Sequence, residues 1–209
     1  MSSAAMAVWA LTGPAGAGKS AVSEILRRAG AVVIDGDRLG HELLSRPEIQ
    51  ARIVSEIGPG YVRDGEVDRA ALGALVFADP VALAGLNAIM HGPLSALATE
   101  KLDILAAAGE HELAVFEAAV YFLLPSPPAV DLVVAVVAPV EQRLQRLVAR
   151  SGGALRSQDA RRRLEAQENL EAHWARADEI IVNDGTLDEL EARTLRIWPR
   201  GKPGRETQP

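Results

Sequence analysis

Short apolar runs alternate along this chain with longer stretches of helical periodicity. The runs cover residues 7–11, 31–34, 113–116, 132–137 and 179–182. Each has the length of a strand, and a continuous apolar run is typical of a strand that is covered on both faces. Strands that alternate with helices predict an α/β fold, with a parallel five-stranded sheet that helices cover on both faces.

Amphipathic periodicity and capping signals predict the helices. They are expected over 19–29, 38–44, 47–57, 69–78, 80–108, 140–149, 158–171 and 187–197. We expect the long fifth helix to be interrupted at His91-Gly92-Pro93, because proline removes a backbone donor. The stretch from Thr186 to Glu189 has the spacing of a capping box. No strand is predicted between residues 40 and 108, so this stretch predicts a helical insertion beside the sheet.

The residues between the first strand and the first helix have a phosphate-binding pattern. The spacing G-x-x-x-x-G-K-[ST] is present in Gly13-Pro14-Ala15-Gly16-Ala17-Gly18-Lys19-Ser20, and Ala21 follows in the helix. Glycines let backbone N–H groups turn toward a polyphosphate, and the helix N-terminus adds unpaired donors. Lys19 then reaches the β- and γ-phosphates, and the Ser20 hydroxyl holds Mg²⁺. The pattern predicts a nucleoside triphosphate site.

Two carboxylates follow the second predicted strand. Asp35-Gly36-Asp37 lies at the carboxyl end of that strand, where open α/β sheets place ligands. Phosphoryl transfer needs a group that orients or deprotonates the acceptor. Asp37 is the favoured candidate, because it opens the next helix; a turn with an Asx cap is the alternative.

Arginines cluster after the fourth predicted strand, at positions 146, 150, 156, 161, 162 and 163. Arg146 and Arg150 are four residues apart, on one face of a helix, and they precede the joint Ser151-Gly152-Gly153. Such a joint suits a lid that closes over a phosphate. For Arg161 to Arg163 a solvated charged face is the alternative.

Four further residues have two interpretations each. Glu117 ends the third strand and either helps to hold a metal or substrate or caps a helix. His91 is either a contact for the acceptor or a structural residue at a helix break. Asn183 and Gly185 follow the last strand and either border the adenine or form a simple turn.

Composition narrows the classes of function. The 209 residues carry a formal net charge of −6, which argues against nucleic acid or a membrane surface as partner. There are no cysteines, so disulfides, thiol catalysis and cysteine-based zinc sites are excluded. No basic leader precedes the short first apolar run. We therefore expect a soluble cytoplasmic protein, as a monomer or a weak homo-oligomer.

Several motifs occur in a specific order. They are Leu11-Thr12-Gly13, Val33-Ile34-Asp35-Gly36-Asp37, the Asp-Gly-Glu-Val-Asp-Arg run at 64–69, Leu86-Asn87 with His91, Gln142 with Arg146 and Arg150, Arg163-Leu164 with Gln167, and Ala177-Asp178 with Asn183-Asp184-Gly185. From residue 7 to about 197, this set resembles the dephospho-CoA kinase family. A generic P-loop kinase shares the first motif and few of the others.

The resemblance implies one domain over residues 1–209 with three parts and a tail. A P-loop NTPase core, similar to nucleoside monophosphate kinases, is expected over about 6–39, 110–149 and 177–198. A helical substrate domain over about 40–109 and a small lid over about 150–176 are expected beside it. The polar tail 199–209 is expected to be disordered.

The resemblance also implies the reaction, an ATP-dependent phosphorylation of the ribose 3′-hydroxyl of dephospho-CoA with Mg²⁺, the last step of coenzyme A biosynthesis. Asp37 is then the base, Lys19 and the P-loop bind the triphosphate, and Arg146 meets the transferred phosphate. Ser20 and Asp37 serve the metal. Arg150, Asn183 and Gly185 are expected at the nucleotide, and Asp35, Asp37, His41, His91 and Glu117 at the acceptor.

The chain departs from the family pattern at three places. His41 stands where the family commonly has arginine, and Leu123 ends a segment that lacks the family's glutamate. Gly92 separates His91 from Pro93. Two other functions fit the residues: another P-loop kinase of a small molecule or nucleoside monophosphate, and an ATP-binding regulatory module without catalysis.

Overall fold

The computed structural model describes residues 6–150, 164 and 171–198. Contacts within the chain divide it into two units. The first contains the described residues of 1–34, 101–122 and 129–209, and the second contains 35–100 and 123–128. Most of the expected lid, including Arg156 and Arg161 to Arg163, and the whole tail 199–209 lie outside the described residues.

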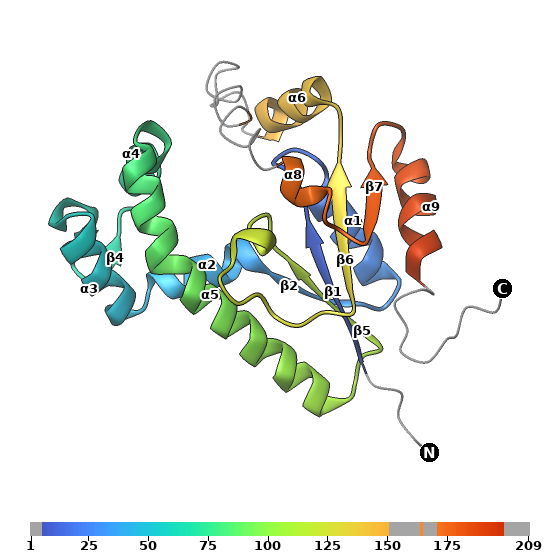
Figure 1. Cartoon of the computed structure of the whole chain (residues 1–209), viewed down its shortest axis with the longest axis horizontal. Helices are drawn as coiled ribbons and strands as arrows, with labels where there is room; N and C mark the ends of the chain where they lie inside the picture. The colour runs from blue at the N-terminus through green and yellow to red at the C-terminus, as the bar shows by residue number, and fades with distance from the viewer. Residues whose placement is uncertain (1–5, 151–163, 165–170, 199–209) are drawn as a thin grey trace. The chain divides into compact units, whose positions relative to one another are not determined.

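The first unit is built on a five-stranded sheet in the order β2-β5-β1-β6-β7 (Figure 1). The strands are β1 (Ala7–Thr12), β2 (Val32–Asp35), β5 (Leu113–Glu117), β6 (Leu132–Val137) and β7 (Glu179–Val182). β1 runs parallel to β5 on one side and to β6 on the other, and β6 runs parallel to β7. The prediction of a five-stranded parallel sheet is therefore confirmed.

The described part of the first unit also contains four helices. They are α1 (Lys19–Arg28), α6 (Val140–Arg150), α8 (Glu171–Trp174) and α9 (Leu187–Ile197). Of these, α1 and α9 share a core with the sheet. Alternate residues of β1 join the apolar faces of α1 and α9 in one core, in which Trp9 is 1% exposed and meets Trp198 edge-on. The capping box is confirmed: Thr186 N–H donates to Glu189 Oε2 at 2.8 Å, and Glu189 N–H donates to Thr186 Oγ1 at 3.3 Å. α9 therefore begins at a fixed residue, directly after the loop that follows β7.

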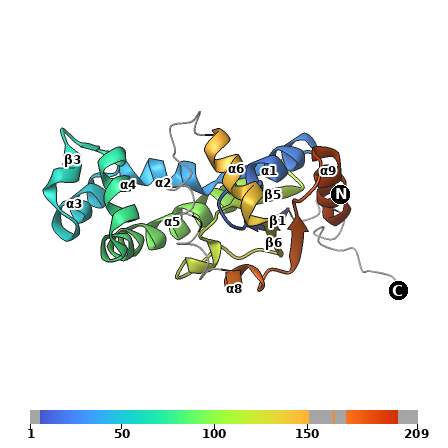
Figure 2. The same cartoon turned by 90° about the horizontal axis from the view of Figure 1, so that it is seen from above.

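The second unit is helical, with one exception that corrects the sequence prediction. Its helices are α2 (Gly36–Leu44), α3 (Pro47–Glu56), α4 (Arg69–Ala78) and most of α5 (Pro80–Ala108), with the 3₁₀ turn η1 (Pro59–Tyr61). Between them β3 (Val62–Arg63) and β4 (Glu66–Val67) form an antiparallel hairpin, which lies with α3 and α4 in Figure 2. Asp64 and Gly65 both have positive φ, as a tight hairpin turn requires. Strands of two residues are too short to produce an apolar pattern.

The long helix α5 is continuous, so the predicted interruption at His91 to Pro93 is wrong. Pro93 lies inside the helix and offers no N–H to the carbonyl of Ile89, four residues earlier. Arg52 of α3 donates from Nη1 to that same carbonyl at 3.3 Å. A side chain from another helix thus replaces the missing backbone donor, which explains how α5 passes through the proline.

By length and composition alone, α5 is the one described helix that is long and apolar enough to cross a membrane. Its residues Ile89, Leu97 and Ala98 are nevertheless buried within the protein, at 0%, 4% and 0% exposure. Burial of this kind is the behaviour of a core helix.

A double-mutant cycle tests the role of Arg52. We expect Arg52→Met to lower the free energy of unfolding by about 1–3 kcal/mol, because the carbonyl of Ile89 loses its donor. In a Pro93→Ala background the backbone N–H returns, so the same substitution should cost much less. Urea denaturation of the four proteins gives the coupling between the two positions.

Arg52 also pairs with Glu56, from Nε to Oε1 at 2.8 Å, and this exposed pair needs its own control. Glu56→Gln removes the ion pair and leaves the carbonyl contact, and it should change stability by less than about 1 kcal/mol. A cycle in which the Arg52 and Pro93 effects simply add would show that the guanidinium does not substitute for the missing N–H.

Candidate active site

The P-loop joins β1 to α1 and leaves no room for side chains at its glycines. A Cβ atom on Gly16 would lie 2.6 Å from the carbonyl oxygen of Arg143 in α6. A Cβ atom on Gly18 would collide with the side-chain amide of Asn183, the residue that follows β7. α6 and the end of β7 therefore approach the loop backbone directly, which requires glycine at these two positions.

Side-chain donors hold five consecutive carbonyl groups of this loop. Lys19 Nζ donates to the oxygens of Gly13 (2.8 Å) and Pro14 (3.1 Å), Arg143 Nε to Ala15 (3.0 Å), Arg146 Nη1 to Gly16 (3.4 Å) and Ala17 (3.3 Å), and Asn183 Nδ2 to Ala17 (2.7 Å). In a planar trans peptide the C=O and the next N–H point in opposite directions. Fixing the carbonyls of Pro14, Ala15 and Ala17 turns the N–H groups of Ala15, Gly16 and Gly18 to the other side, where an anion can bind, while the N–H of Ala17 donates to the oxygen of Pro14.

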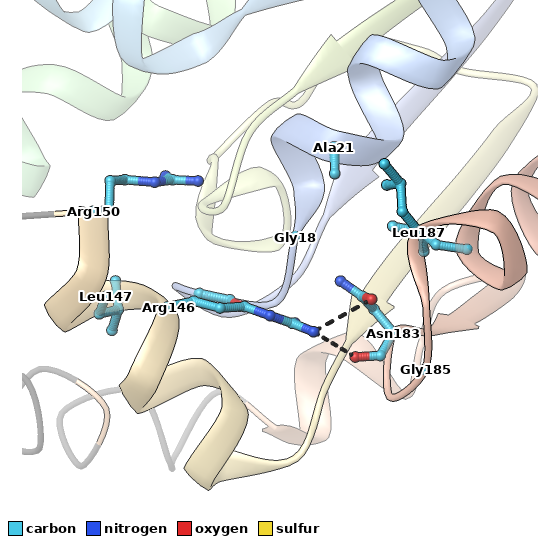
Figure 3. Close-up of a pocket in the computed structure, with 10 residues that line it drawn as sticks. Gly18, Ala21, Arg146, Leu147, Arg150, Asn183, Gly185 and Leu187 are labelled. Atoms are coloured by element: carbon cyan, nitrogen blue, oxygen red, sulfur yellow. Dashed lines mark hydrogen bonds between the residues drawn. The ribbon is translucent and has the colours of Figure 1, made fainter.

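A pocket opens beside the N-terminus of α1 (Figure 3). Its walls come from the P-loop, α1, α6, the loop after β7 and α9, through Gly16, Gly18, Ala21, Arg146, Leu147, Arg150, Asn183, Gly185, Leu187 and Leu190. Arg146 reaches across it, and its Nη2 donates to the backbone oxygen of Asn183 at 3.2 Å and to Oδ1 at 3.5 Å. The pocket thus combines two arginines with apolar side chains at the start of a helix, which suits a nucleotide.

The two arginines of α6 differ in their contacts. Arg146 also receives support from Gln142 Oε1, which accepts from Nη2 at 3.0 Å, so its guanidinium is held on several sides. Arg150 is exposed, and within the described part of the chain its guanidinium makes no hydrogen bond or ion pair. One arginine is therefore part of the wall of the pocket, and the other is available to a ligand.

The loop after β7 is fixed from both sides. Gln142 Nε2 donates to the backbone oxygen of Asp184 at 3.1 Å, and Arg193 of α9 pairs with Asp184 Oδ1 at 2.6 Å. This hydrogen bond from Arg193 lowers the pKa of Asp184, as does the charge of the guanidinium. A side chain on Gly185 would collide with the carboxylate of Glu189, the capping-box residue. The position of Glu189 in the cap of α9 therefore requires glycine at position 185, in the wall of the pocket.

Glu117 ends β5 beside the hydroxyl groups of α1. Its Oε2 accepts from Ser23 Oγ at 2.6 Å, and its Oε1 accepts from Ser20 Oγ at 3.4 Å. No group of three or more His, Cys, Asp or Glu side chains that would hold a metal occurs among the described residues. A hydroxyl with a nearby carboxylate instead fits Mg²⁺, which keeps several waters and takes its other ligands from phosphates.

The other predicted site residues belong to the second unit. Asp35 Oδ1 accepts from the N–H groups of Asp37 (2.9 Å) and Arg38 (3.1 Å), so it caps α2, which begins two residues earlier than predicted. The carboxylate of Asp37 is exposed and makes no hydrogen bond or ion pair with the residues that the structure describes. His41 is exposed on the same helix. The cap therefore uses Asp35 and leaves Asp37 available.

His91 is half-buried on α5, in the same unit. Burial lowers its pKa, because it removes water from the charged imidazolium, and a hydrogen bond with the backbone of Leu123 acts in the opposite direction. Burial therefore favours the neutral form of the His91 imidazole.

The first unit thus brings together the P-loop, Glu117, Arg146, Arg150, Asn183 and Gly185. Sequence reasoning missed Arg143 and Ser23 as site residues. Arg143 is 4% exposed, and Ser23 is 0% exposed. The one available signal was position: both lie on the apolar faces of their helices, where a polar side chain needs a partner.

A P-loop at the carboxyl end of a parallel strand, with arginines on α6 and a carboxylate beside Ser20, is typical of a phosphotransferase of the P-loop kinase class. The comparisons with known proteins agree. The model of the family described as dephospho-CoA kinase matches residues 7–189. The chain belongs to the dephospho-CoA kinase family, whose members use ATP, and it has dephospho-CoA kinase activity in coenzyme A biosynthesis. The predicted family and function are confirmed.

Relatives and solved structures cover nearly the whole chain. The dephospho-CoA kinase of Latilactobacillus sakei is 39% identical over 90% of this chain and 92% of its own. That of Streptomyces avermitilis is 41% identical over 90% of each. The crystal structure of TT1252 from Thermus thermophilus matches with a TM-score of 0.74 and 32% identity, over 94% of this chain and 97% of its own. A shikimate kinase from Bacteroides thetaiotaomicron, 14% identical with a TM-score of 0.56 over 94% of this chain and 98% of its own, shares the fold.

The lowered pKa of His91 predicts how stability depends on pH. Below pH 6.5 the unfolded chain protonates this histidine, while the native protein resists protonation until a lower pH. The unfolded state then binds more protons, so acid lowers the free energy of unfolding. We expect His91→Gln to lose less stability than the natural protein between pH 7.5 and pH 5, by urea denaturation. His41→Gln is the matched control, and an identical pH dependence in the natural and His91→Gln proteins would contradict the prediction.

Proposed function

We propose that this enzyme transfers the γ-phosphoryl group of MgATP to the ribose 3′-hydroxyl of dephospho-CoA, producing CoA and ADP. The observation that supports this most directly is the P-loop itself, in which five consecutive carbonyls are held by side-chain donors. This arrangement turns the loop amides toward one side, as a triphosphate cradle requires. The lining of the adjoining pocket is suited to the nucleoside.

The triphosphate is proposed to lie against residues 13–21, with Lys19 at the β- and γ-phosphates. Lys19 Nζ now donates to two carbonyl oxygens, and phosphate oxygens are stronger acceptors because they are charged. The nucleoside is proposed to occupy the pocket at Asn183 and Gly185. Arg150 is proposed to contact the nucleotide phosphates, because its guanidinium is exposed at the same pocket.

Ser20, through its hydroxyl, and Asp37, through its carboxylate, are proposed as the protein ligands of Mg²⁺. When bound there, the ion would supply positive charge against the negative charge that develops in phosphoryl transfer. Glu117 supports this assignment, since its carboxylate accepts from Ser20 and Ser23. In that position Glu117 orients the serine hydroxyl and is also available to the acceptor.

Asp37 is proposed to accept the proton of the 3′-hydroxyl. Two observations support it: Asp35 engages the first turn of α2, and the Asp37 carboxylate is exposed without a described partner. Asp35, His41 and His91 are proposed to form the remaining acceptor contacts. The neutral imidazole of His91 suits hydrogen bonding to an uncharged group.

Arg146 is proposed to meet the transferred phosphate, because its guanidinium already lies at the carbonyls of Gly16 and Ala17. It exchanges these neutral acceptors for charged phosphate oxygens when the nucleotide binds. The enzyme is proposed to work in the cytoplasm as a monomer or weak homo-oligomer. The acceptor is proposed to be bound despite His41 and Leu123 standing where the family pattern differs.

Replacing Asp37 tests the assignment of the base. We expect Asp37→Asn to reduce turnover of dephospho-CoA by at least about 10³-fold, because the amide cannot accept the proton. The affinity for ATP should stay within about threefold, since the carboxylate acts mainly on the acceptor. A coupled ADP-release assay measures kcat and both KM values.

The matched control is Asp35→Asn at the preceding acidic position. Because asparagine caps a helix about as well as aspartate, this substitution should change stability little; as an acceptor contact, Asp35 should affect KM for dephospho-CoA while kcat stays largely intact. If Asp37→Asn turned over like the natural enzyme, Asp37 would not be the base. Equal turnover of nucleoside monophosphates in place of dephospho-CoA would favour a general nucleotide kinase.

A further inference from the structure

Arg143 is a buried cation that contacts the P-loop in two ways. Its side chain is 4% exposed, and Nε donates to the carbonyl oxygen of Ala15 at 3.0 Å. Its backbone lies against Gly16, where an added Cβ atom would be 3.0 Å from the Cα atom of Arg143. One residue of α6 thus docks on two neighbouring residues of the loop, with both its side chain and its main chain.

This contact differs from those of the other cations at the loop. Lys19 and Arg146 also donate to P-loop carbonyls, but both are partly exposed and are proposed to contact phosphate oxygens once the nucleotide binds. Arg143 is buried on the side of the loop that α6 covers. Its hydrogen bond to Ala15 is therefore the contact that stays in place while the other two cations change partners.

The direction of the Ala15 carbonyl determines the direction of the next amide. Because the peptide group is planar and trans, holding the oxygen of Ala15 toward α6 turns the N–H of Gly16 away from α6. A loop that already has this orientation loses less conformational entropy when an anion binds to its amides. The Nε donor of Arg143 is thus in a position to raise nucleotide affinity without touching the nucleotide.

We propose that Arg143 is a positioning residue that keeps the P-loop in its nucleotide-binding conformation through the hydrogen bond from Nε to Ala15. This inference rests on the proposed binding of the triphosphate at the P-loop. It assigns a function to a side chain that itself contacts neither the phosphates nor the acceptor.

Three substitutions of Arg143 separate the effect of its hydrogen bond to Ala15 from the effect of its charge. In glutamine the Nε2 amide follows the same number of side-chain atoms as Nε in arginine, so Arg143→Gln keeps a donor there and removes the charge. Arg143→Lys keeps the charge but places its nitrogen one bond further out. Arg143→Met fills a similar volume with neither donor nor charge.

The experiment measures KM for ATP, KM for dephospho-CoA, kcat, and ADP affinity by titration calorimetry. We expect Arg143→Met to weaken ADP binding and raise KM for ATP by about tenfold, the effect of one unsatisfied buried acceptor. The KM for dephospho-CoA should change by less than about twofold. Arg143→Gln should restore ATP affinity to within about threefold of the natural enzyme, and Arg143→Lys should behave like Arg143→Met.

Two controls make the outcome decisive. Gln145→Ala, at an exposed position of the same helix, should leave all four quantities unchanged. Thermal unfolding shows whether each variant folds; if Arg143→Met does not, the glutamine and lysine variants decide between donor and charge. The inference is overturned if folded Arg143→Met retains natural ATP affinity, if both KM values rise together, or if Arg143→Lys rescues binding and Arg143→Gln does not.

Lys19→Met separates failure of this inference from failure of the proposed function. If Lys19→Met leaves ADP affinity unchanged, the P-loop is not the nucleotide site and the proposed function fails. If Lys19→Met weakens ADP binding while Arg143→Met does not, the P-loop assignment survives and only the role of Arg143 is withdrawn.

Discussion

The active site of this chain depends on how the carbonyl groups of one loop are satisfied. A loop can present several N–H groups to an anion only if the carbonyls on its other side find donors, because unpaired buried carbonyls are costly. Here Lys19, Arg143, Arg146 and Asn183 supply those donors. They come from α1, from α6 and from the residue after β7, so the sheet order that places β6 beside β1 and β7 beside β6 also brings these donors to the loop.

Much of this arrangement was predictable, because its signals are local. The P-loop spacing, the apolar strands and the capping box at Thr186 each occur within a few neighbouring residues. The ordered motifs also indicated the family that the comparisons then showed. What could not be read from the sequence depends on contacts between distant residues. Arg52 is 37 positions from Ile89, and Arg143 is 128 positions from Ala15.

The sequence also does not show which of the charged side chains on a helix are buried and which are exposed. An arginine on an amphipathic helix is expected to be solvated, so the only sign that Arg143 is buried was its position on the apolar face of α6. Arg146 and Arg150 have the same spacing signal, yet one lies in the pocket wall and the other is exposed. The sequence does not distinguish a buried arginine from an exposed one, because burial depends on which hydrogen-bond acceptors the folded chain places within reach of the guanidinium.

The contact beneath Pro93 also constrains how this chain can change over evolutionary time. A lineage that replaces Pro93 regains a backbone donor in α5, and position 52 is then free to drift away from arginine. The opposite order leaves the oxygen of Ile89 without its donor during the intermediate stage. Substitutions at positions 52 and 93 are therefore expected to occur in a preferred order, with the proline replaced before the arginine.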